Sequence, residues 1–227
     1  MPSDTPHVLY GAQQNYKRLY YSEELAALKV PVTLQAGYGV LKMGTALAKN
    51  LSASGGIGKL VPYNPTTFTG AEVHPGRAYL VATTGTTDSF VYVSKDDSYK
   101  FAVDDDVVIN DDTTAAESLG AITAIDRTTY PHMAKITFTT AIGGTAFTTG
   151  RFAYLCLEAG DSSNNYSDCV GILEKSVDTG TGVNAKGALA TLIIGNCILY
   201  TGMLTNVDSA AKTDISAGTF GNYTYIR

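Results

Sequence analysis

Short apolar runs separated by polar and glycine-rich turns recur along the chain, and their spacing predicts strands more often than helices. The clearest alternation lies at 134–140, where Ile136 and Phe138 point to one face and Lys135 to the other. A period of two is typical of a strand with one buried face. Further strands are predicted at 78–83, 89–94, 106–110, 120–126 and 151–158. Regular short strands with turns between them indicate a small barrel or sandwich.

The segments on either side of this region also favour extended structure. Residues 30–34 read Val-Pro-Val-Thr-Leu, and a residue that precedes proline avoids the helical region. Apolar runs at 170–174 and 188–194 predict two more strands. The segment 60–65 contains two prolines, which lack a backbone donor, and we therefore expect no central strand there.

These elements predict a mostly β fold of the β-rich α+β kind, in three parts. Residues 1–30 form an N-terminal arm. Residues 31–75 and 169–227 together form a discontinuous core domain, and 76–168 form an inserted β domain. The polar loop 160–168 marks the exit from the insertion.

The first thirty residues are polar and rich in tyrosine. We expect one short helix at 22–29, where Ser22 can cap the first turn and Leu25 and Leu28 share a face. A helix of this length is not stable alone, so the segment is predicted to be an arm that orders against another surface; the alternative is a disordered tail. One further helical turn is expected at 113–119, where a glutamate follows two capping threonines.

Charge and hydropathy exclude several classes of protein. The chain carries 16 Lys+Arg against 21 Asp+Glu, a formal net charge of -5. Such a chain lacks the basic surface that binds nucleic acid or anionic membranes, so neither is expected as a partner. No uninterrupted apolar stretch is long enough to span a bilayer, and the N-terminus lacks the pattern of a signal peptide. We therefore expect synthesis in a cytosol.

The side chains that most often carry catalysis are sparse and scattered. Cys156, Cys169 and Cys197 fit neither a disulfide framework nor a zinc site, and we expect buried, reduced thiols. The three histidines are isolated in the sequence, without metal-ligand spacing or a cysteine partner. We predict no catalytic residue, no cofactor and no metal, and hence a protein that is not an enzyme.

An acidic cluster has two interpretations. Residues 104–106 and 111–112 are all aspartates and flank the apolar run 107–109. Clustered carboxylates suit Ca²⁺, but the spacing of an EF-hand loop is absent. The alternative, which we favour, is a pair of charged turns that end a buried strand and keep a sheet edge soluble.

Two separated stretches carry a family resemblance. A glycine-rich turn and strand at 39–44 is followed by Val61-Pro62-Tyr63-Asn64-Pro65, and a Gly-Ile-Leu strand at 171–173 is followed by Val177-Asp178, a Gly/Thr turn and the apolar strand 188–194. These stretches, roughly 31–75 and 169–205, resemble the lambda-type bacteriophage head decoration proteins, also called capsid-stabilising or cement proteins. Members of that family are commonly much shorter, which again makes 76–168 an insertion.

The resemblance implies a structural virion protein. It would form a homo-oligomer, a trimer or else a dimer, on the outer surface of an icosahedral phage head. There it would clamp neighbouring subunits of the major capsid protein and stabilise the expanded capsid. The arm would add a strand to the capsid protein, a recognised mode of peptide recognition. On this hypothesis, deletion of residues 2–28 leaves the fold and the oligomer largely intact and greatly weakens attachment to the capsid.

On this hypothesis the capsid-binding residues lie in the arm and the core: Tyr10, Tyr16, Tyr20, Tyr21, Pro31, Pro62 and Tyr63. The alternative from a different class is a module of a phage tail or a bacterial adhesin that binds a glycan or a host surface. Tyrosines and aspartates within 90–130 would then form the binding face.

Overall fold

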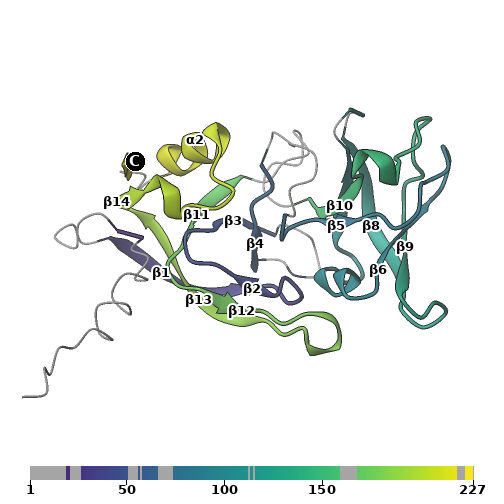
Figure 1. The fold of residues 1–227 in the computed structure, drawn as a ribbon, viewed down its shortest axis with the longest axis horizontal. Helices are drawn as coiled ribbons and strands as arrows, with labels where there is room; N and C mark the ends of the chain where they lie inside the picture. Colours follow the sequence, from purple (N-terminus) through teal and green to yellow (C-terminus); the bar gives the residue numbers. More distant parts are fainter. Residues whose placement is uncertain are drawn as a thin grey trace, which may run out of the picture.

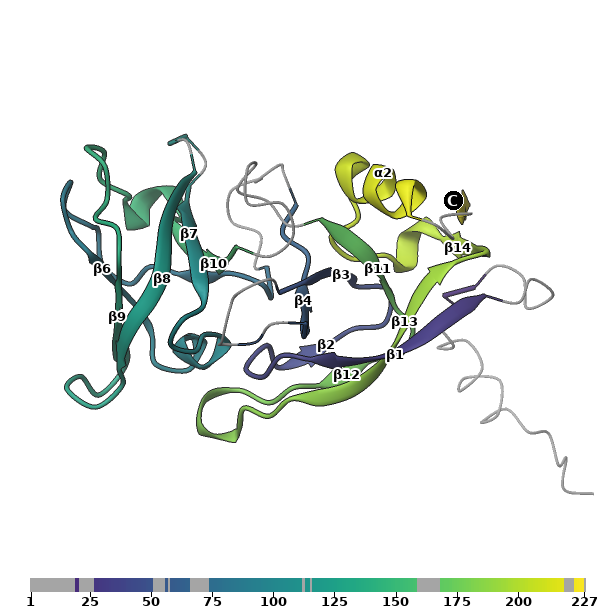
Figure 2. The ribbon, with the colours of Figure 1, turned by 180° about the vertical axis from the view of Figure 1, so that it is seen from behind.

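The computed structural model describes residues 19–20, 27–50, 56, 58–65, 74–111, 113–114, 116–158, 168–218 and the backbone of 223–226. Figure 1 shows two β units side by side, and Figure 2 shows the same arrangement from behind. The strands of one unit come from both ends of the chain, and those of the other from its middle. The prediction of a mostly β fold is confirmed.

The first unit is a closed five-stranded barrel in the order β1-β13-β11-β3-β4. Its strands are β1 (Leu28–Leu34), β3 (Ala46–Lys49), β4 (Leu60–Pro62), β11 (Cys169–Leu173) and β13 (Ala188–Gly195). Neighbours are antiparallel except β1 and β4, which close the barrel in parallel where Leu34 lies beside Leu60. Leu34, Leu47 and Ile172 are fully buried. We refer to this unit as the barrel.

The second unit is a six-stranded sheet in the order β5-β10-β7-β8-β9-β6. Its strands are β5 (Ala78–Tyr79), β6 (Phe90–Ser94), β7 (Asp106–Asn110), β8 (Glu117–Asp126), β9 (Met133–Phe138) and β10 (Tyr154–Leu157). A bridge between Leu80 and Val93 brings the first strand of this order next to the last. The alternation read from the sequence holds, since Ile136 and Phe138 are buried and Lys135 is not.

Smaller elements complete the barrel side of the molecule. The two-residue strands β2 (Val40–Leu41) and β12 (Val177–Asp178) pair, and β14 (Cys197–Tyr200) pairs in parallel with β15 (Tyr223–Ile226). Helix α2 (Ser209–Ala217) packs against β11. Short 3-10 turns occur at η4 (Gly182–Asn184) and η5 (Thr201–Met203) on this side, and at η1 (Asp97–Lys100) and η2 (Thr149–Arg151) in the six-stranded unit.

Both helical expectations conflict with the structure where it can be compared. The expected helix at 22–29 overlaps β1, which begins at Leu28 and pairs with β13; residues 22–26 lie outside the described residues. The expected turn at 113–119 overlaps β8, which begins at Glu117. The Glu117 carboxylate accepts from the Gly143 N–H at 2.5 Å instead of capping a helix. In both places long-range strand pairing outweighs the local helical signal.

Two further differences concern the barrel. Leu60–Pro62 is a strand of the barrel although prolines were expected to prevent this. Pro62 is its last residue, and the next ladder bond is donated by Tyr63 N to the Ala46 carbonyl. Helix α2 was not expected in the polar tail; the Asp208 side chain caps it by accepting from Ala211 N, and Ala211 and Ile215 bury one face. In the six-stranded unit, the strands predicted at 78–83 and 151–158 are present but shorter, as β5 and β10.

A buried polar contact joins the two units. Gln35, which follows β1, donates from Nε2 to the Lys100 carbonyl at 2.9 Å and lies 3.4 Å from a carboxylate oxygen of Asp105. Its Oε1 accepts from Asn50 Nδ2 at 2.8 Å. Gln35, Asn50 and Asp105 are all buried, so these bonds replace water that the groups have lost.

Gly37 sets how closely the units approach. Its φ is +93°, and an added Cβ would overlap the backbone carbonyl of Tyr99. Only glycine therefore fits here, for both its conformation and its lack of a side chain.

We predict that Gly37→Ala destabilises the protein far more than Gly144→Ala. Gly144 has a similar φ of +87° but nothing within 4 Å of an added Cβ, so it isolates the conformational cost. That cost is about 1–2 kcal/mol. The overlap with Tyr99 should add about 2 kcal/mol or more to the loss in unfolding free energy at Gly37. Urea denaturation measures both variants, and equal losses would contradict the close approach.

Candidate functional site

The N-terminal segment meets the barrel at Leu19 and Tyr20. Leu19 is buried, its carbonyl accepts from Tyr200 N at 3.1 Å, and Tyr20 forms an antiparallel bridge with Leu199 of β14. Residues at this point of the arm are therefore already part of the fold. Tyr10, Tyr16 and Tyr21 lie outside the described residues.

Tyr20 also joins a charged contact. Its hydroxyl donates to Glu174 Oε1 at 3.3 Å, and Lys29 forms an ion pair with the same oxygen while lying over the Tyr20 ring. Burial, followed by the Glu174 carboxylate, raises the pKa of Tyr20 well above its usual value. Tyr20 therefore acts as a neutral hydrogen-bond donor that ties the arm to the barrel.

Pro31 lies on an exposed face of the barrel. In the pairing of β1 with β13, Pro31 is opposite Thr191 and Thr33 is opposite Leu189, so these four side chains share one face. Pro31 and Thr33 are exposed, and Leu189 retains 82% of its accessible surface. We call Pro31, Thr33, Leu189 and Thr191 the β1–β13 face.

Pro62 and Tyr63 lie inside the molecule. Both are buried, and Tyr63 has no exposed surface. The Tyr63 hydroxyl donates at 3.2 Å to Asp208 Oδ1, the same atom that caps α2. Burial, followed by Asp208, raises the pKa of Tyr63. Its contacts therefore serve to fix α2 on the barrel.

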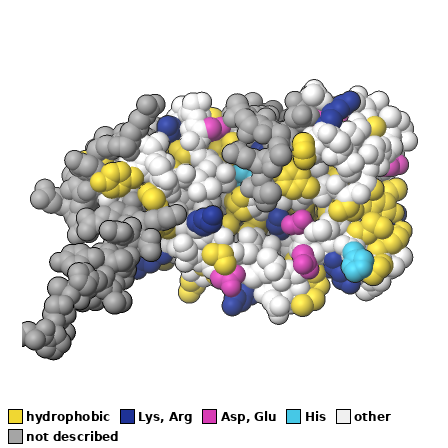
Figure 3. Space-filling model, in the orientation of Figure 1, with side chains coloured by type: hydrophobic (Ala, Val, Ile, Leu, Met, Phe, Trp, Pro, Cys, Tyr) yellow, Lys and Arg dark blue, Asp and Glu magenta, His cyan; other side chains and the backbone are white. Residues whose placement is uncertain are grey.

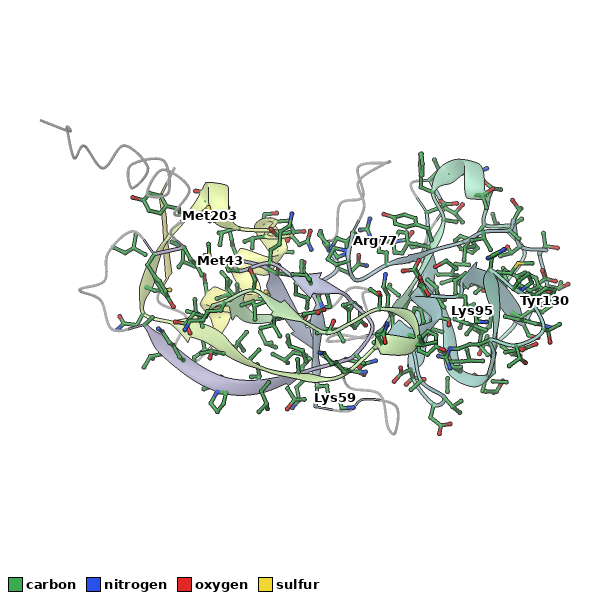
Figure 4. All side chains as sticks on the ribbon, turned by 60° about the horizontal axis from the view of Figure 1, so that its bottom comes forward. Met43, Lys59, Arg77, Lys95, Tyr130 and Met203 are labelled. Atoms are coloured by element: carbon green, nitrogen blue, oxygen red, sulfur yellow. The ribbon has the colours of Figure 1, made fainter. Side chains whose placement is uncertain are left out.

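A cavity of about 410 Å³ lies between the barrel and the six-stranded sheet. Figure 4 places Arg77 at this junction, and Figure 3 shows basic and acidic side chains close together there. The barrel side contributes Tyr38, Leu41 and Lys42, and the other side contributes residues of β5 and η1. The full lining is Gly37, Tyr38, Val40, Leu41, Lys42, Thr45, His74, Pro75, Arg77, Tyr79, Asp96, Asp97, Lys100, Thr181 and Thr205. Sequence reasoning had not singled out this site, because its residues are scattered along the chain.

His74 is a buried histidine in this lining. Its Nδ1 accepts from Gly76 N at 3.0 Å, so the proton of the neutral ring sits on Nε2. Burial, then the cations Arg77 and Lys100, lower the pKa of His74 to about 3, and the Tyr63 backbone opposes this in part. His74 is therefore a neutral donor at physiological pH.

Two members of the acidic cluster, Asp105 and Asp111, are engaged in local structure, and Asp112 lies outside the described residues. Asp105 accepts from Ala102 N at 2.8 Å, and Asp111 accepts from Thr113 N at 2.8 Å and from Thr114 N at 2.5 Å. These bonds build the turns at the two ends of β7. Among the described residues, no group of three His, Cys, Asp or Glu side chains is placed to hold a metal ion.

The three cysteines are free and buried. Burial is the largest cause that raises the pKa of Cys156 and Cys169 to about 12 and that of Cys197 to about 11. Thiols that stay protonated are poor nucleophiles. Their observed role is packing.

Comparison with protein-family models, with curated proteins and with solved structures finds no match to this chain. Within the described part of the chain, no helix has the length and apolar character needed to cross a membrane.

The position of His74 predicts a specific pH dependence of stability. Because its pKa is about 3 in the folded protein and about 6.5 in an unfolded chain, only the unfolded chain takes up the proton between these values. Its contribution to stability is therefore full above pH 6.5 and is lost as the pH falls toward 3, by up to about 1.4 kcal/mol per pH unit. His74→Gln should lack this loss. The unfolding free energy of the variant minus that of the wild type should therefore increase as the pH falls from 6.5 to 4. Urea denaturation measures both proteins across this pH range, and unfolding free energies that change in parallel with pH would contradict the prediction.

Proposed function

We propose that the protein is a decoration protein of a bacteriophage head that binds the outer surface of the expanded capsid as an oligomer. It would clamp neighbouring subunits of the major capsid protein by ordered backbone and apolar contact, without transforming a substrate. A trimer is the expected oligomer, with a dimer as the other arrangement. The virion, after synthesis in a bacterial cytoplasm, is the place of action.

The first support is the position of the two stretches that carry the family resemblance. Residues 76–168 separate them in the chain, yet β11 of the second stretch pairs with β3 of the first in one closed barrel. The barrel therefore brings together the residues on which the resemblance rests. The six-stranded sheet extends away from it at the other end of the molecule (Figure 1). In this proposal the barrel faces the capsid and the six-stranded sheet projects outward.

The observation that carries the proposal is the β1–β13 face. Leu189 is 82% exposed beside exposed Pro31, and burying such a leucine against a partner contributes about 1.5–3 kcal/mol. The arm reaches the barrel through Leu19 and continues into β1 within ten residues. One oligomer would present several such faces and arms, so that weak single contacts combine into tight attachment. Binding to the expanded form alone stabilises that form by mass action.

We expect Leu189→Asp to abolish attachment to expanded phage heads that lack decoration protein. The exposed position tolerates aspartate in the free protein, whereas burying its charge in an interface is costly. Val103→Asp, at a 48% exposed position in a turn of the six-stranded unit, is the matched control and should attach normally. Cosedimentation with purified heads gives the bound fraction.

The structure revises the boundary for the arm deletion. Removal of 2–28 would take away buried Leu19 and the Tyr20 contact with Glu174, so the deletion should stop at residue 18. Removal of 2–18 should leave the thermal unfolding midpoint nearly unchanged and reduce attachment at least tenfold. Full attachment of both this variant and Leu189→Asp would refute the proposal.

A second candidate function is glycan or host-surface binding through the six-stranded unit. Phe90 and Tyr92 of β6 lie edge to face with ring centroids 5.5 Å apart, and Tyr92 and Tyr130 do the same at 5.4 Å. The Tyr92 and Tyr130 hydroxyls are 3.3 Å apart. Figure 4 places Tyr130 at the end of the molecule far from the barrel, where Figure 3 shows apolar side chains gathered. Partly exposed aromatic rings with polar tips suit recognition.

Binding to a glycan array separates the two candidates. If the second function holds, the wild type should label particular glycans, and Tyr130→Ala should lose that labelling while Leu189→Asp keeps it. A protein that attaches to heads and labels no glycan supports decoration alone. Labelling that survives Tyr130→Ala would exclude the aromatic cluster as the site.

A further inference from the structure

The cavity between the two units has the size and position of a small-molecule site. Its volume of about 410 Å³ falls in the range of roughly 300–1,000 Å³ that ligand pockets occupy, and such pockets often lie between domains. Tyr38 and Leu41 form part of the barrel wall, and Tyr79 forms part of the opposite wall. A molecule bound here would contact both units at once.

Among the described residues that line the inner part of the cavity, Arg77 and Lys100 are cations and Asp97 is a carboxylate. Arg77 and Lys100 are buried, and Lys100 is paired with Asp97 at 2.7 Å. The other carboxylate oxygen of Asp97 accepts from Ser94 at 2.8 Å. The Arg77 guanidinium donates to the neutral side chain of Asn64 and stacks over an aromatic ring. At the rim, the exposed side chains of Lys42 and Asp96 carry opposite charges.

His74 adds a hydrogen-bond donor to this wall. Its Nε2 is buried and makes no hydrogen bond of good geometry among the described residues, although a backbone group of Tyr63 lies near the ring. A buried donor without an acceptor costs about 1–3 kcal/mol, so an acceptor supplied by a ligand would be favourable. After burial, the described charged groups that lower the pKa of His74 are the cations Arg77 and Lys100.

We propose that this cavity binds a small organic anion: a carboxylate or sulfonate group carried on an aromatic or aliphatic body. The anionic group lies toward Arg77, Lys100 and the Nε2–H of His74. The apolar body packs against Tyr38 and Leu41. The inference does not rest on attachment to capsids, because it concerns a property of the isolated protein.

Two fluorescent probes of similar shape test the charge requirement. Anilinonaphthalene sulfonate has an aromatic body with one negative charge, and phenylnaphthylamine has nearly the same body without it. We expect the sulfonate to bind at one site per chain, and the neutral probe to bind at least about tenfold more weakly. The native protein is titrated at neutral pH, and near-ultraviolet circular dichroism confirms that it stays folded. Equal affinity for the two probes would overturn the proposal.

Substitutions at the rim test the location. Val40 lines the cavity but is 64% exposed, so either charge is tolerated there. Val40→Asp should weaken binding of the sulfonate about fivefold by repulsion, and Val40→Lys should leave it unchanged or stronger. Leu189→Asp adds the same charge at an exposed position outside the cavity and is the control, with unchanged affinity. If both aspartate variants weaken binding equally, the effect is one of net charge and the site lies elsewhere.

The role of His74 is tested inside the cavity. His74→Phe keeps an aromatic ring of similar size and removes the Nε2–H donor. We expect about tenfold weaker binding of the sulfonate with little change for the neutral probe. Should this variant fail to fold, the pair of Val40 variants decides the proposal. Unchanged affinity for the sulfonate in both His74→Phe and Val40→Asp would overturn the proposal. Leu189→Asp is expected to disturb attachment to heads alone. A failure of the anion proposal is therefore distinct from a failure of the proposed function.

Discussion

The arrangement of the molecule depends on one close approach, that of Gly37 to the backbone of Tyr99. It places the turn after β1 directly against η1, and Gln35 then joins the buried groups of both units by hydrogen bonds. A side chain at residue 37 would separate these surfaces and break the bond from Gln35 Nε2 to the Lys100 carbonyl across the junction. The contact is therefore both steric and polar, and neither part works without the other.

This contact also defines what the molecule offers to partners. With the two units held end to end, the β1–β13 face belongs to the barrel alone, and the aromatic cluster around Tyr92 lies on the far unit (Figure 4). The cavity between them exists because Tyr38 and Leu41 face β5 and η1 across the junction. Attachment to a lattice, recognition of a surface and binding of a small anion thus involve separate residues and can be tested separately.

Sequence reasoning succeeded where neighbouring residues decide the structure, as at Ile136 and Phe138, whose alternation sets one buried face. It failed at Leu28 and Glu117, because pairing with strands distant in the chain outweighed short helical patterns. Helix α2 had a readable signal, since Asp208 precedes Ala211 and Ile215 at cap and core positions. The polar composition of the tail obscured it.

The sequence by itself determined that the protein is mostly β, where most of its strands lie, and that the chain is acidic overall with three widely spaced cysteines. Only the tertiary structure decided that Pro31 is exposed while Tyr63 is buried beneath α2, and that His74, Arg77 and Lys100 meet beside Leu41. The physical reason is that burial and electrostatic environment come from residues far apart in the chain. A local pattern specifies which face of a strand is apolar, whereas the surface that covers it is set by packing.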